Sequence, residues 1–468
     1  MSPASHDEKE CHPEVLRGIS DATGARDPSD YLGMTITARP ASEGRVAAQV
    51  EALARESRRR PVWLRVGQLI DGTSDRPTHD ADIVFDATQF HDPGEVTQQR
   101  AEPDLFLPHV TALPCLIEAH AHLFLDGGPI DFAQRQAYLK QPAEAMVRRA
   151  RSRWAKILRC GVGAVRDAGD KHGVGLALAG EARQHRGKLA ATPWIDSPGA
   201  AIHHSGRYGS FMGQPIEDHA TAAACVGARV ADGADRIKLL VSGIINFKEG
   251  RVTTPPQMPA EEVRAIVEAA RARGKQTFAH ASGADGVENS IEGGVNTVEH
   301  GFFITEEQLA RMRDRQIAWT PTFAPVQLQI DRAKELCWSE EIVSNLRRII
   351  ESHQKMLRRA HETGVIILAG SDAGSCGVPH GLGLLDEMEQ MERAGMPAMS
   401  VIRSATGVSA AALEFGEPIG RIAPGHRARF ILTSHDPSRS VANLRRERTV
   451  VFDGQSIACE RDLDTDGL

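Results

Sequence analysis

Eight short apolar runs, separated by longer amphipathic stretches, constrain the fold of this 468-residue chain more than any other feature of its sequence. The runs have the length of buried strands. The stretches between them show helical periodicity, as where Val263, Ile266 and Val267 share one face. Repeated β–α units predict a parallel sheet, and eight of them over about 300 residues predict an α/β protein with a closed (β/α)8 barrel of the TIM type. The runs cover residues 111–118, 164–167, 194–197, 236–241, 276–280, 297–299, 317–321 and 365–370.

The two ends of the chain predict a second, smaller domain. Residues 61–112 and 416–460 contain strand-like runs and turns, and we expect them to pair into one small β domain, with the barrel in residues 113–415. Residues 1–60 are rich in Ser, Asp, Glu, Arg and Ala and have few large apolar side chains. We therefore expect a poorly ordered arm there, with one helix near 44–58.

Composition argues against several classes of partner. Lys and Arg number 55 against 62 Asp and Glu, a formal net charge of −7, whereas nucleic-acid-binding proteins usually carry a basic excess. No apolar run approaches the ~20 residues that span a bilayer, and the polar start MSPASHDEKECHPEV is unlike a signal peptide, so we expect no membrane partner. The seven cysteines are scattered without a CxxC pair, which fits a reducing compartment and predicts a cytoplasmic location.

Side chains that bind divalent metals stand where several predicted strands end. His120 and His122 close the first strand, and their i, i+2 spacing directs both imidazoles to one side of an extended chain. An H-x-H motif alone is a weak signal in a chain with 19 histidines. However, His280, His300 and Asp372 close three later strands, at the face where barrel enzymes build their active sites.

Lys238 adds a further signal. It lies in the apolar run DRIKLLVSG, between Ile237 and Leu239. A lysine buried in such a strand is costly unless it is paired or chemically modified. Four imidazoles, a lysine and an aspartate at strand ends therefore predict one metal site.

These motifs resemble those of the amidohydrolase superfamily, in particular its dipeptidase-like, prolidase-type metal-dependent hydrolases. The resemblance extends from about Val62 to Gly454. It implies two divalent metal ions, most often Zn²⁺, with Mn²⁺ or Fe²⁺ as alternatives. The motifs that carry it are LIDGT, LPCLIEAHAHL, GVGAVRDAGD, DRIKLLVSG, TFAHASG, VEHGFFI, LAGSDAG, GVPHG and GRIAPGHRARFIL.

The resemblance also implies a role for each of the six residues. The two histidines of the HAH motif would bind the more buried ion, and those of the fifth and sixth strands the more exposed ion. Lys238, N6-carboxylated, would bridge both ions, because carboxylation turns a buried ammonium into an anionic oxygen ligand. Asp372 would contact the buried ion, accept a proton from a bridging hydroxide and deliver it to the leaving amine.

The loop after the third strand, DSPGAAIHHSGRYGS, resembles the place where relatives carry a Gly-rich segment with a histidine. His203, His204, Arg207 and Tyr208 are the candidate substrate contacts, and an Arg–Tyr pair could hold a substrate carboxylate. An ordinary polar surface loop is the alternative. His380 in GVPHG either contacts the substrate or fixes a turn.

Other polar residues near these motifs are expected to have supporting or structural roles. Strand alternation directs Glu299 away from its neighbour His300, which favours a supporting role. Asp167 either supports the metal site or caps a helix. Arg429 replaces an acidic residue common in relatives and bears on packing, and His353 resembles an ordinary surface residue.

The predicted function is a metal-dependent amidohydrolase that cleaves an amide or peptide-like C–N bond of a small molecule by a metal-bridged hydroxide. A mononuclear deaminase or cyclic amidase of a ring substrate is an alternative. Deaminases usually have H-x-x-E after the fifth strand and no lysine in the fourth, whereas this chain has His280-Ala281-Ser282-Gly283 and Lys238. A non-catalytic barrel scaffold would typically have lost ligands, and all six are present here. A homo-oligomer is compatible with the sequence, which leaves the substrate and the oligomeric state open.

Overall fold

The computed structural model describes residues 43–185 and 191–459, so most of the predicted N-terminal arm lies outside the described residues. The described residues from Arg45 onward form one compact unit. Within the described part, no helix is both long enough and apolar enough to cross a membrane.

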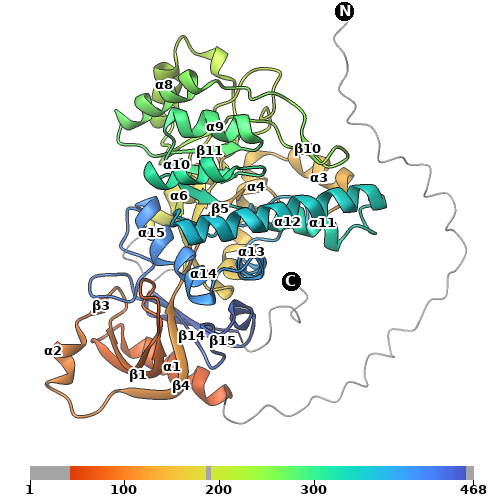
Figure 1. Cartoon of the computed structure of the whole chain (residues 1–468). Coiled ribbons are helices and arrows are strands. Elements are labelled where there is room, and N and C mark those ends of the chain that lie inside the picture. The colour runs from red at the N-terminus through yellow and green to blue at the C-terminus, as the bar shows by residue number, and fades with distance from the viewer. Residues whose placement is uncertain (1–42, 186–190, 460–468) are drawn as a thin grey trace, which may run out of the picture. The chain divides into compact units, whose positions relative to one another are not determined.

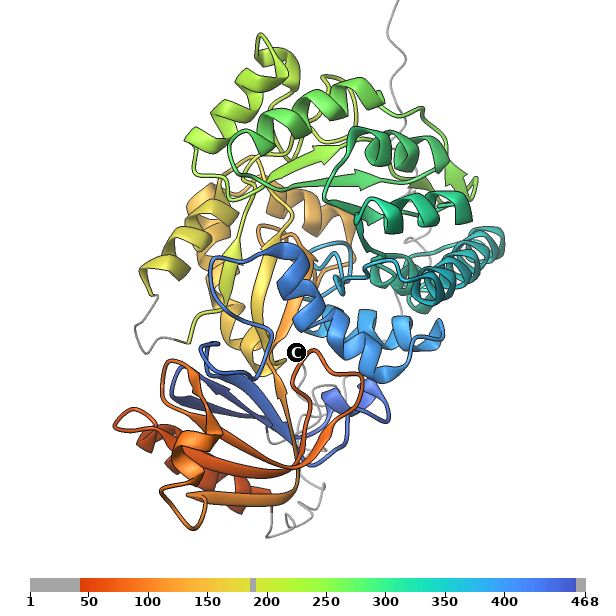
Figure 2. The same ribbon diagram turned by 60° about the vertical axis from the view of Figure 1, so that its left-hand side comes forward.

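The central part of the chain alternates parallel strands with helices, which confirms the mixed α/β class (Figure 1). One parallel sheet has the order β5-β6-β7 and another the order β13-β12-β11-β8. Figure 2 shows the strands, coloured from orange (β5) through yellow to green, with helices on their outer side. The strands are β5 (Leu116–Ala121), β6 (Val162–Asp167), β7 (Trp194–Asp196), β8 (Ile237–Leu240), β11 (Thr277–Ala281), β12 (Thr297–His300) and β13 (Ala318–Thr320).

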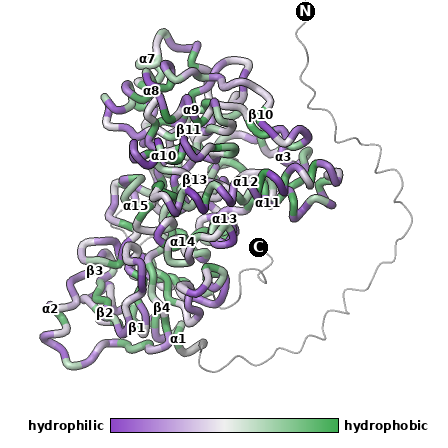
Figure 3. The backbone as a smooth tube through the Cα atoms, in the orientation of Figure 1, coloured by the Kyte–Doolittle hydropathy of each residue, from purple (hydrophilic) through white to green (hydrophobic). Residues whose placement is uncertain are grey.

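The helices between the strands are amphipathic, and in Figure 3 they show purple and green stretches in alternation. In α8 the face predicted from periodicity, including Val263, Ile266 and Val267, is buried. Helix α10 begins at a capping box between Thr305 and Gln308. The helices of this region are α3 (Phe132–Leu139), α4 (Ala143–Ser152), α5 (Trp154–Arg159), α6 (Val174–Gln184), α7 (Ala222–Ala231), α8 (Ala260–Arg271), α9 (Ala284–Gly293), α10 (Glu306–Asp314), α11 (Ala324–Asp331), α12 (Glu340–Thr363), α13 (Leu382–Arg393), α14 (Ala398–Ser404) and α15 (Gly407–Leu413). Short elements are η3 (Ile216–Asp218) and the hairpin of β9 (Ile245–Asn246) and β10 (Arg251–Val252).

Two of the predicted strands differ from expectation. The run 111–118 does not form one strand, because the chain changes sheets at Cys115: its first half belongs to β4 (Leu105–Pro114) and its second half to β5. The run 365–370 is extended but forms only isolated bridges, Trp319 with Ile367 and, just beyond the run, Ala121 with Ala373. Local apolar pattern cannot distinguish a regular ladder from isolated pairing, since both bury the same side chains.

A seven-stranded sheet draws its strands from both ends of the chain, in the order β16-β15-β14-β4-β1-β2-β3. The orange and dark blue strands of Figures 1 and 2 show this pairing of distant segments. Only β1 and β4 pair in parallel; the other neighbours are antiparallel. The strands are β1 (Val62–Leu69), β2 (Thr78–Phe85), β3 (Phe90–His91), β4, β14 (Arg429–Thr433), β15 (Arg448–Phe452) and β16 (Gln455–Cys459), with α2 (Pro93–Thr97) and η4 (Val441–Arg445) between them.

Helix α1 (Glu43–Glu56) precedes this sheet. Its Val50 and Leu53 are buried in the same apolar cluster as Val62 and Phe85 of the sheet. The helix expected near 44–58 therefore packs against the β strands, unlike a poorly ordered arm, because its apolar face covers one side of the sheet.

Candidate metal centre

The four predicted histidine ligands lie at the carboxyl ends of parallel strands, whereas Lys238 lies in the first half of β8 and Asp372 follows the extended run 365–370. Strand β11 pairs with both β8 and β12, so His280 and His300 end neighbouring strands and Lys238 lies on the other neighbour. The N–H of Asp372 donates to the carbonyl of His120 at 2.8 Å, which holds the segment after 365–370 beside β5. Strands that run in parallel present their ends at one face, and this places the ligands together.

The distances between these side chains are short. Ring centroids are 5.6 Å apart for His120 and His122, 5.0 Å for His120 and His300, and 4.5 Å for His280 and His300. Asp372 Oδ1 lies 3.6 Å from His120 Nε2 and 3.4 Å from His122 Nε2. The donor atoms of His120, His122 and Asp372 all lie within 4.8 Å of one another, a spacing compatible with one metal ion.

Each of the four imidazoles has one nitrogen in contact with a group outside the cluster, which leaves its other nitrogen to bind a metal ion. Such outer contacts fix the tautomer and the ring orientation of metal-binding histidines. The contacts join His120 Nδ1 to Glu299 Oε2 at 2.6 Å, His122 Nδ1 to the Gly169 carbonyl at 3.2 Å, His280 Nε2 to the Gly243 carbonyl at 3.3 Å and His300 Nδ1 to Thr322 Oγ1 at 2.7 Å.

Three donor atoms of the cluster are buried without a hydrogen-bond partner in the described part of the chain: His120 Nε2, Lys238 Nζ and Asp372 Oδ1. A buried polar atom that lacks a partner costs free energy. That three such atoms converge at one place is explained if divalent cations occupy the site. The residues present therefore fit the metal ions that the sequence predicts.

Electrostatics keep the histidines in the neutral form that binds metal. Burial, with the nearby Lys238 ammonium, lowers the pKa of His122 and His280 to about 3. Burial also holds the pKa of His120 and His300 well below the ordinary value. Neutral imidazole is the ligand form, so no proton competes with a metal ion at neutral pH.

Burial shifts the other two ligands in opposite directions. It raises the pKa of Asp372 to about 7, against the lowering effects of the Ser375 hydroxyl and of Lys238. It lowers the pKa of Lys238, which is 1% exposed, to about 8. Desolvation disfavours the charged form of both groups, and a metal site of net positive charge would reverse that preference for the carboxylate.

Of the predicted substrate contacts, Tyr208 has its ring beside the ring of a candidate ligand. Its ring centroid is 5.2 Å from that of His280, and burial together with the Asp372 carboxylate raises the pKa of its phenol. A tyrosine that is sensitive to the charge of Asp372 faces the same space as the ligands.

The other members of that loop are engaged elsewhere. Both ring nitrogens of the buried His203 contact backbone carbonyls, those of His204 at 2.9 Å and Gly213 at 3.1 Å. The His204 ring lies between the carboxylates of Glu217 at 2.7 Å and Glu262 at 2.8 Å. The exposed Arg207 donates to the carbonyl of Pro255 at 2.6 Å.

His380 lies behind the cluster. It is buried, and its Nε2 is 3.0 Å from the carbonyl of His122. Of the two roles expected for it, this contact fits the one in which it fixes the backbone.

Strand alternation was the wrong guide for Glu299. His300 has φ 67°, in the left-handed region, so the alternation of the strand ends at that residue. Both Glu299 and His300 consequently contact His120, one through its carboxylate and the other through its ring.

Asp167 supports the end of β5 and does not cap a helix. Its carboxylate accepts hydrogen bonds from the N–H of Leu123 at 3.0 Å and from the Ser197 hydroxyl at 2.7 Å. The N–H groups of Val174 and Gly175 at the start of α6 donate to the carboxylate of a different residue, Asp170.

Arg429 contributes to packing, as expected. It is buried in the seven-stranded sheet and pairs with Asp453 at 2.8 Å and Glu417 at 3.2 Å. Neither partner belongs to the ligand cluster.

Sequence reasoning missed several polar neighbours of the cluster, among them Glu118 and Ser375. Glu118 is buried, its pKa is raised to about 7 by burial, and it accepts hydrogen bonds from both the N–H and the hydroxyl of Ser371. Ser375 donates to Asp372 Oδ2 at 2.8 Å. An acid in the apolar run LPCLIEAHAHL was a usable signal for Glu118, whereas nothing in the sequence marked Ser375.

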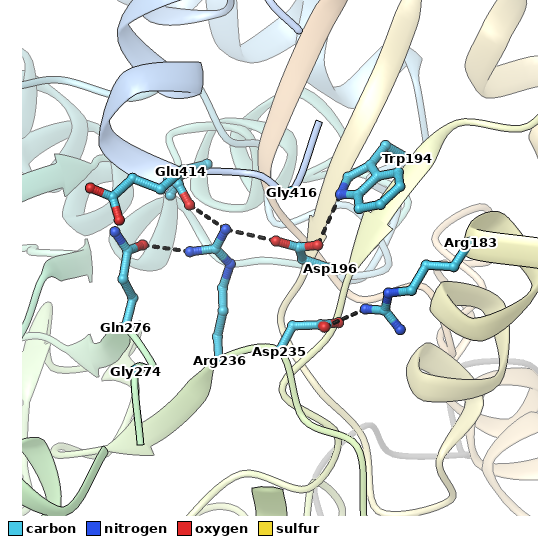
Figure 4. A pocket seen from close by; sticks show the side chains of 10 residues that line it. Arg183, Trp194, Asp196, Asp235, Arg236, Gly274, Gln276, Glu414 and Gly416 are labelled. Atoms are coloured by element: carbon cyan, nitrogen blue, oxygen red, sulfur yellow. Dashed lines mark hydrogen bonds and ion pairs between the residues drawn. The ribbon is translucent and has the colours of Figure 1, made fainter. Parts of the chain in front are cut away.

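A cavity of about 490 Å³ lies at the opposite ends of the strands. It is lined by Trp194 at the start of β7 and by Arg236 and Gln276 just before β8 and β11. Figure 4 shows that polar side chains of its lining bond to one another, since Arg236 donates to both Gln276 and Asp196. It is no part of the candidate metal centre.

Comparison with known proteins agrees with this geometry. The profile of the amidohydrolase family matches residues 111–457, which include all six candidate ligands. The chain belongs to the amidohydrolase family. The predicted family is thereby confirmed.

Individual relatives add detail. The chain is 26% identical over 213 residues to an uncharacterized protein of Mycobacterium tuberculosis; the match covers 46% of this chain and 56% of that protein, so the chain spans just over half of its length. A Xaa-Pro dipeptidase solved with methionine in its active site is 28% identical, with a TM-score of 0.71 over 86% of this chain and 100% of that one. The ochratoxinase of A. niger, 19% identical with a TM-score of 0.68 over 85% and 96% of the two chains, shares the fold. Family membership and the dipeptidase neighbour support a hydrolase that acts on carbon–nitrogen bonds.

Proposed function

We propose that this amidohydrolase cleaves an amide or peptide-like C–N bond of a small molecule with the help of two divalent metal ions. The observation that carries the proposal is the convergence of three buried atoms without a hydrogen-bond partner in the described residues: His120 Nε2, Lys238 Nζ and Asp372 Oδ1. A scaffold protein would gain nothing from three unsatisfied polar atoms, whereas a metal centre needs them.

Each metal ion would be held by a pair of histidines, the first by His120 and His122 and the second by His280 and His300. Lys238, in its N6-carboxylated form, would bridge both, and Asp372 would complete the first site. Zn²⁺ is the expected metal, with Mn²⁺ or Fe²⁺ as alternatives. When bound, such ions activate a water molecule and polarise the scissile carbonyl.

The contacts of Asp372 support a role in moving protons during the reaction. Ser375 holds its Oδ2, which leaves Oδ1 directed at the ligand histidines. We propose that Asp372 takes a proton from the attacking water and passes it to the leaving amine, so that the nitrogen departs as a neutral group.

We propose Tyr208 as a substrate contact, because its ring packs on His280 and its phenol is near Asp372. His203 and His204 would reach a substrate only if their present contacts broke, whereas the exposed Arg207 has further N–H groups that could donate to one. The substrate itself stays open; the dipeptidase neighbour makes dipeptides the first class to test.

We also propose that the two parallel sheets are parts of one (β/α)8 barrel of the TIM type in residues 113–415, beside a small β domain formed by 61–112 and 416–460. Backbone hydrogen bonds between the sheets support closure. They run from the N–H of Ile202 to the carbonyl of Lys238 at 2.9 Å, from Leu368 to Trp319 at 2.9 Å and from Ala119 to Ala369 at 2.9 Å. The part of the expected arm before Glu43 lies outside the described residues, and a cytoplasmic location and a homo-oligomer stay predictions.

The test combines metal analysis with a substrate screen. Protein produced with added Zn²⁺ or Mn²⁺ is assayed against dipeptides, N-acyl amino acids, lactams and carbamates, and its metal content is measured alongside. We expect about two metal ions per chain and turnover in one class. His280→Asn should lose the second ion and the turnover, whereas both should be retained in His79→Asn, which alters an exposed histidine on β2. A protein that binds no divalent metal even after addition would refute the proposal, and release of ammonia from a ring substrate would favour the deaminase.

A further inference from the structure

A fully buried ion pair lies beside the ligand histidines. Glu299 and Arg166 have exposed side-chain fractions of 0% and 1%, and Arg166 Nη2 lies 2.9 Å from both carboxylate oxygens. Glu299 Oε2 in turn lies 2.6 Å from His120 Nδ1. We propose that Arg166 and Glu299 are positioning residues that hold His120 protonated at Nδ1, with its Nε2 lone pair directed at a metal ion. The inference rests on the proposed metal centre.

The arginine is itself held from three strands besides its own. Its Nε donates to the carbonyl of Ala119 at 2.6 Å, and its terminal nitrogens donate to the hydroxyls of Thr297 at 2.8 Å and Thr320 at 3.3 Å. The Thr297 hydroxyl also donates to Glu299. Because Ala119 directly precedes His120, the same guanidinium fixes both the backbone before that ligand and the carboxylate that holds its ring.

Stability alone does not account for such a pair. Burying two charges costs desolvation that their attraction roughly repays, so apolar residues of similar size would hold these strands together as well. The ion pair provides a hydrogen bond between Glu299 and His120 Nδ1, which apolar residues could not provide. A carboxylate on the far nitrogen orients a ligand imidazole and raises its basicity.

Of the four candidate histidine ligands, His120 is the only one in the described structure whose outward-facing ring nitrogen contacts a carboxylate. The other three contact backbone carbonyls or a hydroxyl. Glu299 also neutralises Arg166, whose guanidinium carbon lies 4.6 Å from the Phe278 ring centroid, as does Lys238 Nζ. Without Glu299, an unpaired cation would stand close to the metal centre and oppose metal binding.

The test measures the affinity of metal-depleted protein for Zn²⁺ by competition with a coloured chelator, and the visible absorption of the Co²⁺ form. In Glu299→Gln we expect Zn²⁺ to bind about 10- to 100-fold more weakly and the Co²⁺ bands to shift. The double variant Arg166→Met with Glu299→Gln removes both charges, so it leaves no unpaired buried charge and guards against failure to fold. We expect it to bind Zn²⁺ more weakly than wild type as well, because it too lacks the carboxylate on His120.

The chain offers a matched control. Arg236 and Asp196 form a second ion pair of similar burial at 2.7 Å, at the far ends of the strands. Asp196→Asn, alone and with Arg236→Met, breaks that pair without touching the ligands. We expect both control proteins to retain wild-type Zn²⁺ affinity and Co²⁺ absorption, even where they unfold more readily.

The outcomes separate the two proposals. Wild-type protein that binds no metal refutes the proposed function. Wild-type protein that binds metal while both Glu299 variants bind it equally well, with unchanged Co²⁺ bands, refutes the positioning role alone. As a measurement that needs no folded variant, nitrogen NMR of histidine-labelled metal-free wild type should show His120 protonated at Nδ1; protonation at Nε2 would overturn the inference.

Discussion

Replacing Lys238 with methionine should make the metal-free protein more stable while it abolishes metal binding. Burial lowers the pKa of this lysine from 10.5 to about 8, so an ammonium at neutral pH costs the folded state about 3 kcal/mol. Methionine removes that charge at similar length. It also removes the contact of Nζ with the Phe278 ring at 4.6 Å, worth about 1 kcal/mol. The balance is a gain of about 2 kcal/mol in the free energy of unfolding.

The gain in the free energy of unfolding of Lys238→Met should depend on pH in a defined direction. Because the folded-state pKa is depressed, the unfolded wild type binds more protons between pH 8 and 10.5, and wild-type stability rises with pH across that interval. The advantage of Lys238→Met should therefore be full below pH 8 and disappear towards pH 10.5. Urea unfolding of both proteins, metal-free and in CO₂-free buffer, at pH 7 and at pH 10 measures it.

A matched substitution checks the reasoning. Lys140→Met changes an exposed lysine at the end of α3 and should alter stability little at either pH. If metal-free Lys238→Met were less stable than wild type at pH 7, the argument that this lysine is held at a cost for the sake of a ligand would be refuted. Full metal content in Lys238→Met would refute its role as a ligand.

Three further substitutions test individual contacts. Tyr208→Phe should lower kcat/KM about 10-fold at unchanged metal content, the worth of one hydrogen bond; an unchanged value would show that the phenol does not touch substrate. Ser375→Ala should lower kcat about 10-fold or more, because Asp372 Oδ2 loses its donor at 2.8 Å, and a change in KM alone would contradict that reasoning. His353→Leu should reduce the loss of stability on acidification between pH 6.5 and 4. Burial lowers the pKa of His353 to about 4, so in that interval the unfolded wild-type chain binds a proton at His353 that the folded chain does not. Urea unfolding across the interval measures the effect, and identical acid sensitivity of the two proteins would contradict the prediction.

Sequence reasoning identified the residues of the cluster because their signal is local. An H-x-H pair at the end of an apolar run, and later His and Asp residues at the ends of similar runs, follow from the geometry of parallel strands. The structure brings these side chains together at the expected face. Their metal-binding roles stay predictions until metal content is measured.

The sequence-based predictions were wrong for residues whose surroundings depend on distant parts of the chain. His353 resembled a surface residue of an amphipathic helix, yet it is 2% exposed, stacked on Phe302 at 4.0 Å and within 2.9 Å of the Pro321 carbonyl. Strand alternation failed at His300 because a single left-handed φ turns the chain. Neither the burial of His353 nor the left-handed φ of His300 changes the pattern of apolar residues in the sequence.

The sequence by itself therefore determined the α/β class and the family, and it predicted the candidate ligands. Hydrophobic periodicity and the residue types at strand ends depend only on residues close together in the sequence, so they can be recognised without the structure. Only the tertiary structure decided which nitrogen of each imidazole faces the cluster and that Tyr208 but not His204 lies beside it. It also decided that Glu299 and Arg166 meet at His120. Those outcomes depend on pairings between strands far apart in the chain, where an ångström decides whether a hydrogen bond forms.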